Sequence, residues 1–412
     1  MTKIHSGVLF ASILVGCSSD APPGASVGVD KTLPDSPLAQ LQDVSLIRAG
    51  DSFTLAGYDS VSGLVHWARL ALDGTLTQET SFAFAPQPVV GPVFAATKKT
   101  NPGDQLVALA FVNSATVSGG YDLVATVHTL GAAAPAAPIV LAPPLPAGTD
   151  PSTVQLAAGA AASGNFGYVA WGIRVTGINI SYLLLPADAI TTAAPSKFFD
   201  DAQVPQWDCL APQGRSTGFS FGAITPNPSF ATSDFQTVEV DESGLPTIMT
   251  YQLQVEVVNC QIVGSPTPAG NYFMAFQGTE NGANAIDFAT YYPPVDPLTQ
   301  AGTVTTQNPV MSAALFGGPL SMPRAAWASS AGGDVVIGLE RKSGPEVVRY
   351  TYNAIRHGST LKLRSVNGNA GPLAAWVGDD AVYATYTDQV KSGSTPATKR
   401  YFMRIDSPAS LP

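Results

Sequence analysis

Residues 50–72 read GDSFTLAGYDSVSGLVHWARLAL, and this stretch decides the fold class. It opens with a Gly-Asp pair, continues with an apolar run from Phe53, and reaches a second apolar run at Leu64. Glycine supplies the positive φ of a tight turn, and aspartate tolerates that conformation and bonds to its own backbone. The stretch therefore predicts a turn followed by two β-strands.

The same turn pattern recurs along the chain at intervals of 45 to 63 residues. We interpret its members as structural turn residues in preference to calcium ligands, because single carboxylates in separate repeats do not form a cage. They are Gly50, Asp51, Gly103, Asp104, Gly164, Asn165, Gly270, Asn271, Gly333, Asp334, Gly378 and Asp379. A seventh pair, Gly214-Arg215, fits the spacing but differs in its second residue.

Two apolar runs follow each turn. The first runs begin at Phe53, Leu106, Tyr168, Phe219, Tyr272, Val335 and Val382, and the second at Leu64, Asp122, Ile180, Phe235, Ala285, Val347 and Arg400. Such a period in a β-rich chain is typical of propeller blades, which bury both faces only when neighbours cover them. The series over residues 41–412 resembles β-propellers in general, and this resemblance implies seven four-stranded blades. Six blades, eight blades and a β-sandwich array are alternatives.

The last repeat leaves too little chain for a fourth strand of its own. We therefore expect residues 27–41 to supply that strand and to close the ring.

Composition supports an all-β chain. Of the 412 residues, 39 are glycine and 34 are proline, and both break helices throughout the sequence. The apolar share of 45% is too high for a disordered chain, and beyond the first residues no segment has the 18 apolar residues that would span a bilayer.

The N-terminus has the pattern of an export signal. Residues 8–16 form a short apolar run that ends at Cys17, and the run from Leu14 to Cys17 resembles the bacterial lipobox. This resemblance implies a signal peptide over residues 1–16 and a lipid-anchored Cys17. It also implies an exported protein held at the cell envelope, at the outer membrane because Ser18 follows the cysteine. A flexible tether is predicted over residues 17–40.

Charge narrows the class of partners. The formal net charge of −10 falls to −11 once residues 1–16, with Lys3, are removed. Nucleic acid is therefore not an expected partner. No metal and no cofactor are expected either, because His66, His128 and His357 lie in separate repeats and no phosphate-binding glycine loop occurs. We expect a monomer.

Two cysteines remain once Cys17 is lipidated. Cys209 and Cys260 fit one disulfide in an oxidising compartment, and two buried free thiols are the alternative. In the chain-entropy model, a disulfide that closes the loop between Cys209 and Cys260 would stabilise the fold by roughly 4 kcal/mol.

The sequence predicts no catalytic residue. Residues 214–218 match the spacing of a nucleophile elbow, but proline and glycine prevent the helix that must follow. The neighbouring acids Asp200-Asp201 and Asp379-Asp380 point to opposite faces of an extended chain. An enzyme is therefore the less favoured reading, and a glycosidase-like propeller hydrolase acting on polysaccharide is the alternative function.

A binding or scaffold module for a protein or glycan is the favoured function. Propeller ligands meet the connections that gather at one face of the ring. The longest are expected at residues 200–208, 222–234, 277–284, 340–346 and 388–399. The first of these contains Trp207 and Asp208, a candidate anchor for such a ligand, with packing between blades as the alternative role of the tryptophan.

Overall fold

The structure is a computed structural model of the chain. It describes residues 26–33, 36–41, 44–98, 103–141, 145, 147–151, 154–160, 164, 167–173, 178–185, 196–201, 209–215, 218–227, 232–241, 246–253, 257–264, 272–280, 283–292, 303–312, 324–327, 334–341, 344–351, 356–362, 374–378, 381–392 and 395–406. No helix within these ranges is long and apolar enough to cross a bilayer.

The described strands form antiparallel sheets of four. Sheet 1 contains β2 (Val44–Ala49), β3 (Ser52–Asp59), β4 (Leu64–Ala71) and β5 (Leu76–Ala83), and sheet 2 contains β6 (Val93–Thr97), β7 (Gln105–Asn113), β8 (Tyr121–Thr129) and β9 (Ile139–Val140). Sheet 3 contains β10 (Gln155–Ala160), β11 (Gly167–Ile173), β12 (Ile178–Leu185) and β13 (Ser196–Asp201). Sheet 4 contains β14 (Cys209–Arg215), β15 (Gly218–Asn227), β16 (Thr232–Asp241) and β17 (Pro246–Leu253).

The second half of the chain repeats this order. Sheet 5 contains β18 (Val257–Gly264), β19 (Tyr272–Glu280), β20 (Ala283–Tyr292) and β21 (Thr303–Ser312), and sheet 6 contains β22 (Arg324–Trp327), β23 (Asp334–Arg341), β24 (Gly344–Thr351) and β25 (Arg356–Lys362). Sheet 7 contains β26 (Ala374–Gly378), β27 (Ala381–Ser392), β28 (Thr395–Asp406) and, from the other end of the chain, β1 (Ser26–Thr32). The apolar runs predicted after each turn coincide with the second and third strands of these sheets.

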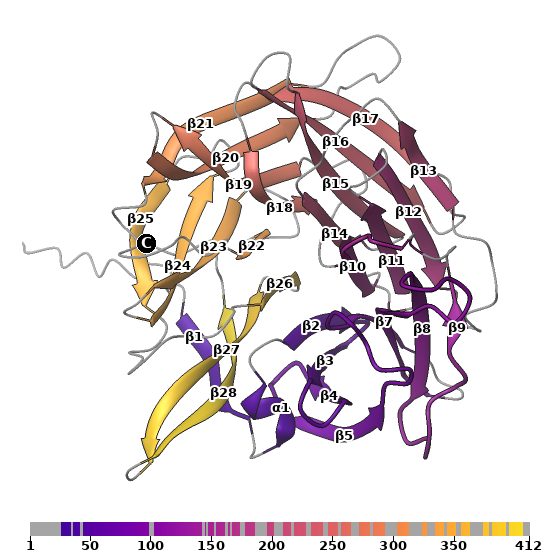
Figure 1. Cartoon of the computed structure of the whole chain (residues 1–412). Helices are drawn as coiled ribbons and strands as arrows, with labels where there is room; N and C mark the ends of the chain where they lie inside the picture. The colour runs from indigo at the N-terminus through magenta and orange to yellow at the C-terminus, as the bar shows by residue number, and fades with distance from the viewer. Residues whose placement is uncertain are drawn as a thin grey trace, which may run out of the picture.

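The sheets are arranged in a ring with one strand of each at the centre (Figure 1). The innermost strand β2 contacts β6, β6 contacts β10, and the series continues through β14, β18, β22 and β26 back to β2. A ring of four-stranded sheets around a common centre is a β-propeller. The predicted all-β propeller class is therefore confirmed.

The N-terminal segment closes this ring. β1 pairs with β28 in antiparallel register, from Ser26 opposite Asp406 to Thr32 opposite Tyr401. A short helix, α1 (Pro37–Gln40), follows and contacts β28, β3 and β4. The tether predicted over residues 17–40 is thus too long, because strand pairing begins at residue 26. Low charge, proline and glycine suggested a free linker, but Val27 and Val29 belong to a paired strand.

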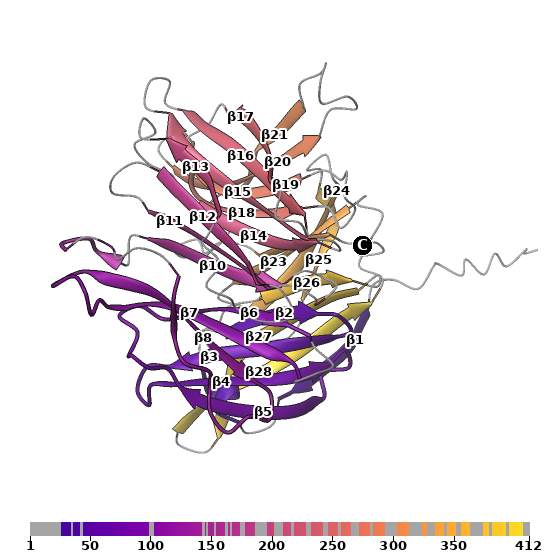
Figure 2. The same ribbon diagram turned by 90° about the vertical axis from the view of Figure 1, so that its right-hand side faces the viewer.

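Buried apolar side chains fill the spaces between sheets 7 and 1, 1 and 2, and 2 and 3, which lie side by side in both views (Figure 2). Phe53 and Leu55 of sheet 1 pack with Tyr383 and Phe402 of sheet 7. The opposite face of sheet 1, with Trp67, packs on sheet 2, and a third cluster joins sheets 2 and 3. Sheets 1 and 2 thus bury both of their faces between neighbours, as the blades of a ring do.

Candidate functional site

Strand register defines two opposite ends of the sheets. The turn face, as we name it, carries the connections from first to second strand, where the Gly-Asp pairs lie, and those from third to fourth strand. The hairpin face carries the connections from second to third strand and those leading from one sheet to the next. Figure 1 shows the innermost strands around the centre of the ring.

The described members of the predicted turn pairs lie in, or directly beside, the connection from the first to the second strand of their sheets. Gly50, Gly103 and Gly164 lie between the first and second strands of sheets 1, 2 and 3, and all three have positive φ. In sheet 7 the connection from the first to the second strand begins after Gly378. In sheet 4 it begins after Arg215. In sheet 6, Asp334 is the first residue of β23. Asn165, Gly270, Asn271, Gly333 and Asp379 lie outside the described residues.

Three of these turns are packed together. The amide of Lys98, which follows β6, donates to the carbonyl oxygen of Gly164 at 2.6 Å. A Cβ atom on Gly164 would lie 2.7 Å from the amide nitrogen of Gly50, a distance that the backbone could not tolerate. Glycine is therefore required at residue 164 by close approach as well as by φ.

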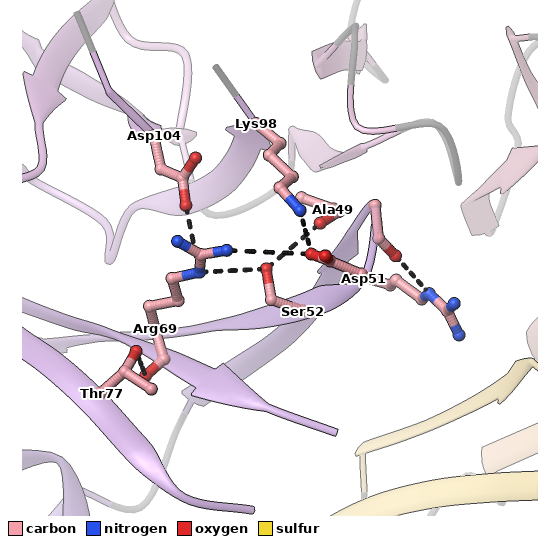
Figure 3. A network of polar contacts seen from close by, with 9 residues as sticks. Ala49, Asp51, Ser52, Arg69, Thr77, Lys98 and Asp104 are labelled. Carbon is pink, nitrogen blue, oxygen red and sulfur yellow. Dashed lines mark hydrogen bonds and ion pairs between the residues drawn. The ribbon is translucent and has the colours of Figure 1, made fainter. Parts of the chain in front are cut away.

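Four charged side chains from sheets 1 and 2 meet at this turn face (Figure 3). Lys98 donates from Nζ to the carboxylate of Asp51. Arg69, from β4, lies 3.8 Å from Asp51 through Nη2 and 3.4 Å from Asp104 Oδ2 through Nε. The same Nε donates to Ser52 Oγ at 3.3 Å. We call Asp51, Arg69, Lys98 and Asp104 the turn cluster.

The turn cluster brings together the aspartates of two successive repeats through one guanidinium. Asp51 is 74% exposed, and the pKa of its carboxyl is lowered mainly by the hydrogen bond from Lys98. Asp104 is only 12% exposed. A glycosidase needs one carboxyl with a raised pKa to act as general acid. A carboxylate held charged by lysine and arginine joins neighbouring sheets but does not provide that acid.

A second polar contact joins sheets 1 and 2 in their buried interface. Trp67 donates from Nε1 to His128 Nδ1 at 3.1 Å, and Phe82 stacks on the imidazole with ring centroids 4.8 Å apart. Burial lowers the pKa of His128, while the backbone of Ala132 acts in the opposite direction. The hydrogen bond from Trp67 and the lowered pKa both favour the neutral imidazole.

The other two histidines considered in the sequence, His66 and His357, lie in strands of two different sheets. His66 is buried in β4, and burial lowers its pKa against the opposing effect of Asp59 and Glu79. His357 belongs to β25, and its side chain lies outside the description. Among the described residues no group of three or more His, Cys, Asp or Glu side chains could hold a metal ion.

Several predicted site residues fall outside the described part. The structure describes neither the backbone nor the side chains of Cys17, Trp207 and Asp208. Cys209 begins β14 and Cys260 lies in β18, and these two innermost strands contact each other. The side chains of both cysteines lie outside the description, so their pairing stays a prediction.

The long connections predicted at the hairpin face are shorter than expected. Pairing continues through polar residues, glycine and proline, so that β15 reaches Asn227 and β27 reaches Ser392. The connections that separate the paired strands are residues 228–231, 281–282, 342–343 and 393–394. The connection predicted at residues 200–208 starts later, because β13 continues to Asp201, and residues 202–208 lie outside the described residues.

One hairpin projects from the rest of its sheet. β26 pairs with β27 only as far as Thr385, and β1 pairs with β28 only from Tyr401 onward. The remaining β27–β28 pairs continue to Ser392 opposite Thr395. We call residues 387–392 and 395–400 the arm. The arm extends from sheet 7 as a two-stranded ribbon (Figure 1), and it belongs to the hairpin face because it carries the connection from β27 to β28.

Comparison with one solved structure, a polysaccharide lyase, supports the fold. A polysaccharide lyase, Uly1, is similar over 88% of this chain and 89% of its own, with a TM-score of 0.54 and 11% sequence identity. The Dos1 propeller covers 89% and 78% at a TM-score of 0.44 and 12% identity. Prolyl oligopeptidase B from Galerina marginata covers 90% of this chain and 48% of its own, at a TM-score of 0.41 and 10% identity. No family model and no curated protein matches the sequence.

Sequence reasoning missed the cations of the turn face. Arg69 lies in a predicted strand and Lys98 follows one, so neither stood out as a partner of Asp51. The available signal was the single arginine among the apolar residues 64–72, two positions from Trp67 on the same strand face.

Proposed function

We propose that this chain is an exported, lipid-anchored protein whose seven-bladed propeller binds a protein or glycan ligand without transforming it. The seven described sheets, with β1 completing the last, support the blade number. The lipobox resemblance at Cys17 supports the anchor.

The turn cluster is the observation that favours binding over catalysis. It contains the two described carboxylates that converge from successive repeats, and both are held by Arg69. A polysaccharide hydrolase requires a proton donor opposite a carboxylate, whereas these acids are paired with cations. The carboxylates therefore serve to hold the rim of the ring in place, and a rigid ring presents its connections to a ligand.

The hairpin face is the proposed ligand surface. Trp207 lies in the sequence between the end of β13 and the start of β14, both of which belong to the hairpin face, and the arm extends from the same face of sheet 7. An aromatic residue beside acids suits the apolar face and the hydroxyls of a sugar ring, or a protein chain. Because the polysaccharide lyase shares the fold, polysaccharides belong among the ligands to be screened.

Glycan arrays and pull-downs with a form that begins at Ser18 test this proposal. Binding should saturate, fall in Trp207→Ala, and persist in Lys98→Ala, which alters the turn face alone. Bound polysaccharide should keep its chain length. Shortening of the polysaccharide, or equal binding by both variants, would contradict the proposal.

Two measurements test the covalent features. Incorporation of a labelled fatty acid should be lost in Cys17→Ala. A thiol titration of the denatured protein should find no free Cys209 or Cys260 until a reductant is added, because their strands are neighbours at the centre of the ring.

A further inference from the structure

We propose that the anchored propeller turns its turn face toward the membrane and presents its hairpin face to the ligand. This orientation rests on the proposed lipid anchor at Cys17 and deepens the proposed function, since it states which surface is free for a partner. The observation that carries it is the place at which β1 begins.

β1 begins at the turn face of sheet 7. Ser26, its first residue, pairs with Asp406 at the end of β28. Asp406 also pairs with Ala381, the first residue of β27. Ala381 in turn pairs with Gly378, the residue after which the chain turns from β26 to β27. The chain upstream of Ser26 therefore leaves the ring at the Gly-Asp end of the sheet.

Neighbouring sheets share this orientation. Phe53, next to the Gly50-Asp51 turn of sheet 1, packs on Tyr383, next to the corresponding turn of sheet 7, with ring centroids 4.8 Å apart. Arg69 joins the turns of sheets 1 and 2, and Lys98 joins those of sheets 2 and 3. One face of the described part thus carries both the turn cluster and the start of β1.

The chain between the anchor and the ring is short. Eight residues separate Cys17 from Ser26, and the segment spans at most about 30 Å even when fully extended. An anchor this short, fixed at one face, keeps that face nearest the lipid. The anchored chain, which lacks residues 1–16 with Lys3, carries a net charge of −11, so its overall charge gives no attraction to anionic lipid.

The opposite face then points into the surrounding compartment. It holds the arm and the facing ends of β13 and β14, between which Trp207 lies in the sequence. A soluble protein or an extended polysaccharide could reach both of these segments without approaching the bilayer, which is the steric requirement for a receptor on a short anchor.

Energy transfer to the membrane measures this orientation in the full lipidated chain. Ser118, in the β7–β8 hairpin, and Ala133, just after β8, are both exposed and lie at opposite ends of β8. The nine residues of β8 span about 30 Å. A fluorescent amino acid is placed at either position, and the protein is anchored in phosphatidylcholine–phosphatidylglycerol vesicles that contain an acceptor lipid.

Transfer from position 133 should exceed transfer from position 118 by about twofold or more, given this separation. Insertion of twenty Gly-Ser residues before Ser26 should remove the difference while the protein still floats with the vesicles. Equal or reversed transfer in floating protein would overturn the orientation and leave the anchor intact. Protein that carries no acyl chain and does not float would overturn the anchor and the orientation together.

Discussion

Arg400 donates a hydrogen bond from Nε to the carbonyl oxygen of Leu38, 3.1 Å away, across 362 positions of sequence. The guanidinium is fully buried, donates from Nη1 to Thr385 Oγ1 at 3.2 Å, and bonds through Nη2 to the carbonyl of Leu41. One side chain of β28 thus satisfies the backbone that follows β1. Closure of the ring is held by this arginine as well as by the strand ladder.

Replacement of Arg400 by alanine should open this closure. The change leaves buried carbonyl groups without their donor and creates a cavity, so we expect the free energy of unfolding to fall by about 3 kcal/mol. Urea unfolding measures it. Arg400→Lys keeps the charge but not the planar fork, so it should recover only part of the loss. Wild-type stability in Arg400→Ala would show that the contact is incidental.

Replacement of Gly164 by alanine separates close packing from backbone strain. Gly164 and Gly63 both have positive φ, but a Cβ atom on Gly63 meets nothing within 4 Å. Gly63→Ala should therefore cost only the strain of the left-handed region, about 1 kcal/mol. Gly164→Ala should cost clearly more, because its Cβ would press on the backbone at Gly50. Equal midpoints in thermal unfolding would argue against contact between the turns.

The two cations of the turn cluster, Lys98 and Arg69, should contribute unequally to the stability of the fold. Lys98 pairs with the exposed Asp51, so Lys98→Ala should change the stability by less than about 1 kcal/mol. Arg69 also meets the largely buried Asp104, and Arg69→Ala should cost about 1 to 2 kcal/mol. The effect of Lys98→Ala should vanish in high salt, as surface pairs are screened. Unfolding in low and high salt provides the comparison.

Acid should weaken the packing of sheet 1 against its neighbours, because His128 lies in the interface with sheet 2 and His66 lies on the opposite face of β4. Burial lowers the pKa of His128 and of His66 below 6.5, so the unfolded chain binds protons first as pH falls. The stability that these groups contribute is complete above the unfolded pKa and is lost as pH falls toward the folded pKa. The slope is at most about 1.4 kcal/mol per pH unit for each histidine.

His128→Gln isolates one of these groups. The variant should be less stable than wild type at pH 7.5, because it loses the stacking of the imidazole on Phe82 and the Nδ1 position that accepts from Trp67. Its stability should also change less between pH 7 and pH 5. A slope that matches wild type would assign the acid sensitivity to other groups.

The sequence predicted the second and third strands of each sheet well. Glycine with positive φ and runs such as Leu106–Val112 leave few alternatives to a turn and a buried strand. The outer strands were less predictable, since β9 has only two residues and β1 lies in a segment rich in proline and glycine. Pairing between strands, rather than local composition, decides those elements.

The candidate site was less predictable than the fold. Asp51 and Asp104 were recognised as turn residues, but their shared partner Arg69 lies in another strand, and no local pattern reveals a contact between sheets. The same holds for Arg400, whose partners come from the far end of the chain. The strands of the hairpins were predicted too short, because pairing between two strands continues through polar residues as long as the partner strand is present.

Native-state hydrogen exchange over residues 26–32 tests the ring closure most directly. The amides of β1 that pair with β28 should be protected to a degree comparable with residues 401–406, and Arg400→Ala should lower the protection of both segments together. Exchange of residues 26–32 at the rate of a free peptide, with residues 401–406 still protected, would contradict closure of the propeller by its N-terminal strand.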